Sequence, residues 1–285
     1  MSVDALRAAA IEAIFDEELR SVYFVLKGGT ALRLLGIGSR GSLDLDFSMP
    51  EDLQAVDTVA RRLEASLVRA FDRLGYEVFD FRFGAKPSAR SAVQPAWWGG
   101  YECNFKVVPK SGLSIPLEEK RRTAAVIGPL QERKFRLQIS KHEYCGSTSE
   151  IELQESTIRV YAPALIAAEK LRAICQQMQE YEHKGPKTPR ARDFYDIHAV
   201  STEASIDMTA DDNVALVRRS FEAKRVAPAL LTLLPRYREF HRPDWAAVEG
   251  SVAGTLMPFD FYFDFVTDLA RRVERRLALT SANEV

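Results

Sequence analysis

The stretch that decides the fold is KGGTALRLLGIGSRGSLDLDF, which spans residues 27–47. It follows VYFVL at 22–26, a β-branched and aromatic run that predicts a short buried strand. Gly28 and Gly29 break the strand, TALRLL predicts a helix, and later glycines stop that helix. SLDLDF at 42–47 then alternates polar and apolar residues, as a half-buried strand does. The order is therefore strand, glycine turn, helix and strand.

The rest of the chain divides into two parts by its periodicity. Strand and helix patterns alternate at first, and from Pro163 onward the pattern is helical almost to the end. We expect further strands at 76–83, 101–108, 135–140 and 157–162, helices at 4–20 and 51–74, and a connecting loop at 109–130. This predicts an α+β fold with an N-terminal lobe, residues 1–160, built on a mixed β-sheet, followed by a mainly α-helical lobe, residues 161–285.

Composition indicates an ordinary globular protein. Hydrophobic residues make up 46% and charged residues 28% of the 285 residues, which is enough apolar material for a core. No apolar run approaches the roughly 20 residues of a membrane helix. The N-terminus lacks the basic-then-apolar pattern of a secretory signal, and the three distant cysteines fit neither disulfides nor zinc. We expect a cytoplasmic protein that does not bind membranes.

The formal net charge is −1, so the chain as a whole is not a binder of polyanions. Its basic residues nevertheless gather in clusters at 120–136, 184–192 and 218–242. Each cluster is either an ordinary solvated helix surface or a contact for phosphate backbones.

Asp44 and Asp46 stand two apart on the second strand of the opening stretch. Side chains at that spacing share one face and lie about 6–7 Å apart, while Leu45 and Phe47 point to the core. Neighbouring carboxylates repel one another unless a cation lies between them, and Mg²⁺ meets that need. The alternative is a polar strand face in water.

The glycine turn strengthens the first interpretation. Gly28 and Gly29 let backbone N–H groups approach an anion closely. The helix that begins near Thr30 directs its N-terminal dipole toward phosphate. Lys27 adds a charge and the Thr30 hydroxyl adds a donor. A tight structural turn alone would contain the same glycines, so the combination with the acid pair carries the argument.

This order of motifs resembles the DNA polymerase β-like nucleotidyltransferase superfamily. LKGGTALRL and SRGSLDLDF look more specifically like the AbiEii/AbiGii toxin family of nucleotidyltransferases, which act in type IV toxin–antitoxin and phage-abortive systems. Two downstream stretches resemble further motifs of that family: APALIAAEKLRAI, with Lys170 and Arg172, and RARDFYDIHAV, with Arg190, Arg192, Asp193 and Asp196. The resemblance spans about residues 22–200, and the last 85 residues carry no usable motif.

The resemblance implies a role for each matching residue. Asp44 and Asp46 would ligate Mg²⁺, as two ions with the bound NTP, and Lys170 would neutralise triphosphate charge. Asp193 would be a catalytic residue, with a general base as one possible role. The implied nucleotide-binding residues are Lys27, Gly28, Gly29, Thr30, Ser42, Arg192 and Asp196. Without the glycine turn and the acid pair upstream, the pattern would indicate that Lys170 is a surface lysine and that Arg192 and Asp196 form an ordinary ion pair along a helix.

Two further residues, Glu102 and Ser42, are candidates for the site around the acid pair. Many superfamily members carry a third acid on a later strand, and here Glu102 is a candidate that shares its strand face with Asn104 and Lys106. Ser42 lies two residues before Asp44 and should share its face, so we expect a phosphate on Ser42 to switch the enzyme off.

The resemblance implies a Mg²⁺-dependent toxin that transfers NMP from an NTP to an RNA acceptor, commonly tRNA, and so blocks translation. A cognate antitoxin is the implied partner. Two alternatives share the same motifs: a nucleotidyltransferase that modifies a small molecule such as an antibiotic, and a non-catalytic module that binds a partner on a degenerate transferase fold.

Overall fold

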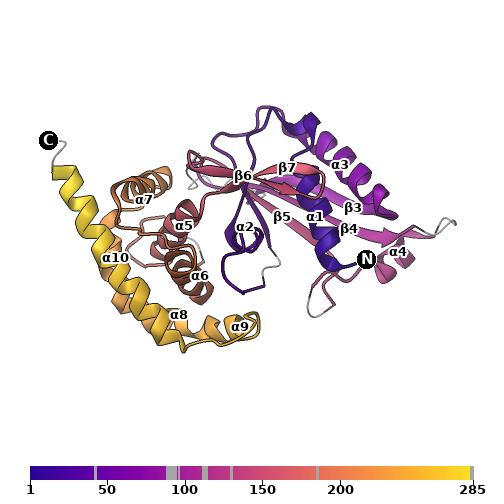
Figure 1. Cartoon of the computed structure of the whole chain (residues 1–285). Coiled ribbons are helices and arrows are strands. Elements are labelled where there is room, and N and C mark those ends of the chain that lie inside the picture. Colours follow the sequence, from indigo (N-terminus) through magenta and orange to yellow (C-terminus); the bar gives the residue numbers. More distant parts are fainter. Residues whose placement is uncertain are drawn as a thin grey trace. The chain divides into compact units, whose positions relative to one another are not determined.

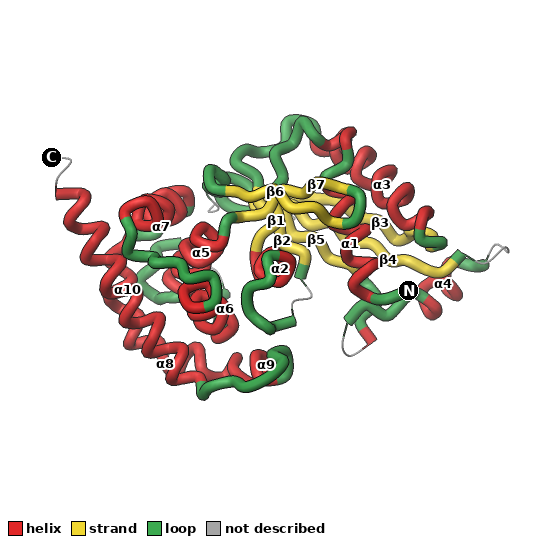
Figure 2. The backbone as a smooth tube through the Cα atoms, in the orientation of Figure 1, coloured by secondary structure: helices red, strands yellow, loops and turns green. Residues whose placement is uncertain are grey.

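The computed structural model describes residues 1–41, 44–87, 95, 97–110, 115–128, 131–183 and 186–282. The chain folds into two compact units. The first comprises Met1–Lys27, Leu43–Cys145 and Ser149–Val160, and the second comprises Gly28–Ser42, Gly146–Thr148 and Tyr161–Val285. The sheet belongs to the first unit and the second is mainly helical (Figure 1, Figure 2), which confirms the α+β class.

Seven strands form the sheet of the first unit, in the order β3-β4-β5-β2-β1-β7-β6. They are β1 (Val25–Lys27), β2 (Leu45–Ser48), β3 (Tyr76–Lys86), β4 (Gly100–Pro109), β5 (Phe135–Ser140), β6 (Thr148–Leu153) and β7 (Ser156–Tyr161). β2 runs antiparallel to β1 and parallel to β5, and β1 runs parallel to β7. The sheet is therefore mixed, as the sequence predicts, and β2 lies near its middle.

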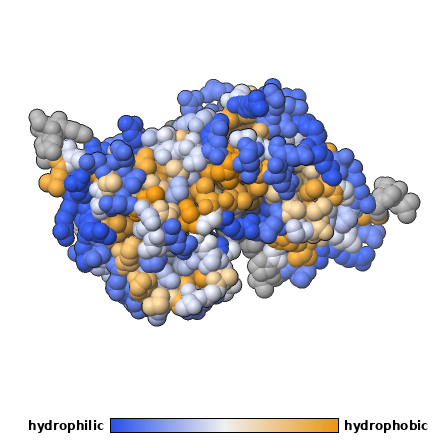
Figure 3. Space-filling model, viewed as in Figure 1, coloured by the Kyte–Doolittle hydropathy of each residue, from blue (hydrophilic) through white to orange (hydrophobic). Residues whose placement is uncertain are grey.

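Two helices cover one face of this sheet, α1 (Val3–Ile14) and α3 (Val56–Arg73), which pack against each other. Phe71 of α3 meets Phe105 and Phe135 with ring centroids 5.5 and 5.7 Å apart. Phe15, at the end of α1, packs against Phe47 of β2 at 6.2 Å. The core thus lies between these helices and the sheet. Figure 3 shows mostly hydrophilic residues along the outer side of α3, as its amphipathic pattern requires.

The second unit is built around α5 (Pro163–Cys175), which is buried almost all round. The other helices of this unit are α2 (Gly28–Leu34), α6 (Ala191–Thr202), α7 (Asp211–Ala223), η3 (Pro228–Tyr237), α8 (Arg238–His241), η4 (Arg242–Asp244), α9 (Trp245–Glu249) and α10 (Phe259–Ala282). α5 packs against α6 and α7, and α10, yellow in Figure 1, packs against the same two helices. Phe194 of α6 stacks on Phe263 of α10 at 5.1 Å. Within the described parts of the chain, every helix is too short or too polar to cross a bilayer.

Four features differ from the sequence-based expectation. The loop expected at 109–130 contains a helix, α4 (Leu117–Thr123), the strand β6 precedes β7, and a short 3₁₀ helix, η1 (Glu17–Leu19), follows α1. The segment Gly28–Ser42, placed in the first lobe by its sequence position, groups with the second unit. Its end is bound there because the N–H of Gly38 donates to Glu203 at 2.8 Å and the N–H of Ser39 donates to the Tyr195 hydroxyl at 3.2 Å.

Candidate active site

In the first unit, β2 presents Asp46 on the face of the sheet that α1 and α3 leave uncovered. Leu45 and Phe47 are 2% and 0% exposed, and Phe47 points to the helix-covered side. Since side chains alternate along a strand, Asp46 points the other way. Asp44, which directly precedes β2, is two residues from Asp46, and both acids are partly exposed. The strand therefore offers carboxylate oxygens beside solvent rather than within the core.

Lys27 stands directly opposite Asp46, because β1 and β2 pair Lys27 with Asp46 in their antiparallel register. Paired residues in an antiparallel ladder share a face. The lysine is only 9% exposed, and its Nζ lies 3.3 Å from Ser140 Oγ and 3.8 Å from Glu143 Oε1. The Lys27 ammonium, fixed by these contacts, therefore lies on the same face of the sheet as the Asp46 carboxylate.

The glycine turn begins at the residue bonded to Lys27. Gly28 has a φ of 73°, in the left-handed region that glycine adopts without strain. Gly28, Gly29 and Thr30 form the first turn of α2, and Thr30 is only 1% exposed. The predicted order of strand, glycine turn, helix and strand is therefore present.

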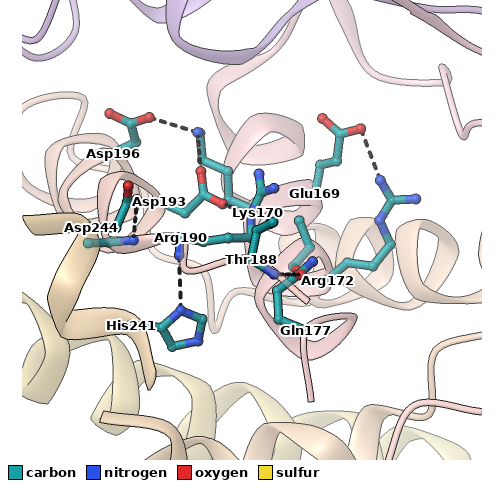
Figure 4. A network of polar contacts seen from close by, with 12 residues as sticks. Glu169, Lys170, Arg172, Gln177, Thr188, Arg190, Asp193, Asp196, His241 and Asp244 are labelled. Carbon is teal, nitrogen blue, oxygen red and sulfur yellow. Dashed lines mark hydrogen bonds and ion pairs between the residues drawn. The ribbon is translucent and has the colours of Figure 1, made fainter. Parts of the chain in front are cut away.

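In the second unit, Lys170 of α5 lies between two carboxylates of α6 (Figure 4). Its Nζ is 2.8 Å from Asp193 Oδ1 and 2.7 Å from Asp196 Oδ2. Asp193 and Asp196 share a helix face because they are three residues apart. Lys170 is 7% exposed, Asp193 0% and Asp196 3%. The structure thus brings together three of the residues that the sequence nominates and makes Lys170 a buried cation rather than a surface lysine.

Further cations explain how two buried carboxylates stay ionised. Burial opposes the charge of Asp193, but Arg190, Lys170 and Arg192 outweigh it and hold its pKa well below the ordinary value. Burial likewise opposes the charge of Asp196, and Lys170 and Arg40 outweigh it and lower its pKa. Arg190 Nε donates to Asp193 Oδ2. Arg192 is exposed on α6 and acts on Asp193 through its charge.

Sequence reasoning assigned no role to Arg40, although the residue lies inside the stretch SRGSLDLDF. Its Nε and Nη2 donate to the two oxygens of Asp196 at 3.0 and 2.9 Å, a bidentate contact. The Arg40 side chain is 9% exposed. The available signal was an arginine in a glycine- and serine-rich segment, but its carboxylate partner is 156 residues further along the chain.

Glu102 of β4 is the candidate third acid. The register pairs Glu102 with Gln138 of β5, and Gln138 with Asp46 of β2, so one strand separates the two acids. Burial opposes the charge of Glu102, but hydrogen bonds from Lys86 and Asn104 outweigh it and lower its pKa. Glu102 therefore shares the sheet face of Asp46 and is bound by protein cations. Ser42 lies outside the described residues.

Comparison with known proteins identifies the family. The profile described as nucleotidyl transferase AbiEii toxin, type IV TA system, matches residues 10–265. The chain belongs to this AbiEii family. It is therefore a nucleotidyltransferase of the toxin class from type IV toxin–antitoxin systems, and the family implies a cognate antitoxin. None of the curated proteins compared with the sequence matches it.

Solved structures resemble this AbiEii protein in fold. JHP933 from Helicobacter pylori is 17% identical, with 98% of this chain and 94% of that chain covered and a TM-score of 0.50. A candidate nucleotidyltransferase from H. pylori is 16% identical, with 98% and 96% covered and a TM-score of 0.49. An antigenic nucleotidyltransferase-like protein from Paracoccidioides brasiliensis is 13% identical, with 89% and 95% covered and a TM-score of 0.41. At 17% identity the likeness to JHP933 concerns the fold alone.

In two of the three basic clusters of this AbiEii protein, some side chains pair with the protein's own acids. In the cluster at 120–136, Lys120 contacts Glu77, and Arg121 donates to Asp80 at 2.9 Å. In the cluster at 218–242, Arg242 binds Asp260 at 2.9 Å. Pairs of this kind are typical of an ordinary solvated helix surface.

Proposed function

We propose that this AbiEii protein uses Mg²⁺ and an NTP to transfer a nucleoside monophosphate to an RNA acceptor, with tRNA as the preferred substrate. The observation that carries the proposal is the β1–β2 pair. It sets Asp46, with Asp44 two residues earlier, opposite the held ammonium of Lys27. Nucleotidyl transfer develops charge on phosphate oxygens, so it depends on fixed cations and on positioning.

The donors in β2 fit Mg²⁺. Among the residues that the structure describes, no group of three His, Cys, Asp or Glu side chains is placed to hold a metal. Mg²⁺ does not require such a group, because it keeps several waters and takes one or two carboxylates together with substrate phosphates. Asp44 and Asp46 would hold it. When bound, the ion supplies charge neutralisation at the phosphates.

Lys27 and the glycine turn complete the proposed phosphate contacts. The Lys27 ammonium is held on the carboxylate face of the sheet, where it offsets phosphate charge. Gly28 carries no side chain and has a left-handed backbone that brings successive N–H groups toward one side. Thr30 is almost fully buried in the first turn of α2.

The Lys170 network adds positive charge. Lys170, Arg40 and Arg190 bind the carboxylates of Asp193 and Asp196, and the charge of Arg192 also acts on Asp193. Such a gathering of cations suits a triphosphate. A general base acts best with a pKa near the working pH, whereas cations keep the pKa of Asp193 well below its ordinary range. We therefore assign Asp193 to holding Lys170 rather than to proton transfer.

The test is incubation of the purified protein with each labelled NTP, total RNA or tRNA, and either Mg²⁺ or EDTA. We expect the RNA to be labelled in the presence of Mg²⁺ and not in the presence of EDTA. Sequencing of the RNA ends then identifies the site of addition. Asp44→Asn should lower the labelling about a hundredfold or more while the protein stays folded. Label on an aminoglycoside and none on RNA would overturn the RNA acceptor, and undiminished transfer in EDTA would overturn the metal.

A further inference from the structure

The helix α6, which carries Asp193 and Asp196, starts without a cap of its own. Its N-cap residue, Arg190, makes no capping contact with its side chain. The first N–H groups of a helix have no partner within it and need an acceptor from elsewhere. Two acceptors come from a segment about fifty residues further along. The N–H of Arg190 donates to His241 Nδ1 and the N–H of Ala191 donates to Asp244 Oδ2, each at 3.1 Å.

These contacts act on the end of α6 that holds Lys170. Asp193 is in the first turn of the helix, its N–H donates to the Arg190 carbonyl at 2.9 Å, and its carboxylate binds both Lys170 and the Arg190 side chain. Figure 4 shows His241 and Asp244 beside Arg190, with Asp193 and Lys170 next along the same network. A shift of the backbone at 190–191 would therefore move the carboxylate that fixes the lysine.

His241 is poorly explained as a packing residue. It is 0% exposed and packs against Phe194 and Phe240, with ring centroids 5.1 and 4.9 Å away. Its Nε2 is buried and has no hydrogen-bond partner among the described residues. An unpaired buried nitrogen destabilises the fold, and an apolar side chain would avoid that cost. What the imidazole provides is the Nδ1 acceptor at the start of α6.

We propose that His241 and Asp244 are positioning residues of the nucleotidyltransferase site, which fix the start of α6 so that Asp193 holds the Lys170 ammonium in place for the triphosphate. The proposal rests on the proposed function of Lys170. It also assigns a role to residues in the last 85 positions of the chain, where the sequence shows no motif.

The test compares variants that remove the acceptor with variants that keep it. His241→Leu and Asp244→Ala remove it, whereas His241→Asn and Asp244→Asn retain an oxygen near the same place. We expect KM for NTP to rise about tenfold in the first pair, as for other side chains that orient a binding group. The second pair should recover most of that loss, and KM for RNA should stay constant throughout.

Asp207→Ala is the matched control for a stability effect. Asp207 Oδ1 accepts from the N–H and hydroxyl of Thr209, 2.9 and 2.7 Å away, in the same unit but outside the network. This variant should lower Tm and leave KM for NTP unchanged. If the wild type is active and Asp244→Ala lowers Tm without raising KM for NTP, the positioning role is wrong. A wild type that transfers no nucleotide would instead count against the proposed function, and NTP binding by calorimetry then decides the positioning role.

Discussion

The Arg40 guanidinium donates two hydrogen bonds, of 3.0 and 2.9 Å, to the Asp196 carboxylate, although 156 residues separate them in the chain. The two side chains are 9% and 4% exposed. This ion pair ties the segment after α2 to α6, and Lys170 contacts the same carboxylate at 2.7 Å. Arg40 therefore belongs to the set of cations that keep Asp196 ionised.

Arg40→Ala should destabilise the protein by about 3 kcal/mol, because removing one partner of a buried pair leaves an undercompensated charge. Arg40→Lys should fall between wild type and alanine, since an ammonium does not reproduce the two parallel N–H bonds. Urea unfolding measures both. The control is Arg20→Ala, whose pair with Glu17 is 73% and 81% exposed. Its loss should cost under about 1 kcal/mol, and equal midpoints for the two alanine variants would refute the expectation.

Lys170→Met tests the central cation of the network. The change keeps an unbranched side chain one atom shorter and removes the charge that Asp193 and Asp196 share. We expect KM for NTP to rise at least about tenfold, because a lost charged hydrogen bond costs about 1.5–3 kcal/mol. Steady-state transfer assays measure it, with circular dichroism to confirm folding. Lys134→Met, at an exposed position before β5, is the control, and a similar KM in both variants would exclude Lys170 from nucleotide binding.

The sequence predicts the elements around the acid pair well because their signals are local. The alternation in SLDLDF sets Leu45 and Phe47 against the core and leaves Asp46 on the other face, as the structure confirms. The glycine turn is equally local. Lys170, Asp193 and Asp196 were nominated by resemblance to family motifs, and the structure adds that one ammonium joins both acids.

The missed elements lack local signals. β6 and β7 meet at a turn whose Gln154 has a φ of 51°, without the Asn-Gly or Asp-Gly pair that marks a hairpin. α4 lies in a stretch rich in proline and glycine and is anchored by distant acids, Glu77 and Asp80. Arg40 and His241 depend on partners about 156 and 51 residues away. Contacts of that kind leave no pattern in a single sequence.

Asp44→Asn and Asp46→Asn test the metal ligands separately from the fold. Each keeps the shape of the side chain and removes a negative charge from the sheet face. We expect nucleotide transfer to fall about a hundredfold or more in each, in line with the loss of one preorganised electrostatic contact. Mg²⁺ with a non-hydrolysable NTP should raise Tm of the wild type and leave both variants unchanged. A full Mg²⁺-dependent Tm increase in the double variant would place the metal elsewhere.

The stability of the wild type should fall as the pH drops from 6.5 toward 4. Burial lowers the pKa of His241 from 6.5 to about 4, so the unfolded chain binds a proton in this window and the folded chain does not. Linkage then makes the free energy of unfolding decrease with falling pH, by about 3 kcal/mol in full and by about 2 kcal/mol between pH 7.0 and 4.5. His241→Asn does not titrate, so its stability should decline by that much less over the same range. His198, whose pKa is also lowered by burial, is present in both proteins and cancels in the comparison. Urea unfolding at pH 7.0 and 4.5 measures the difference, and parallel declines in the two proteins would show that His241 is protonated as readily in the folded state as in the unfolded one.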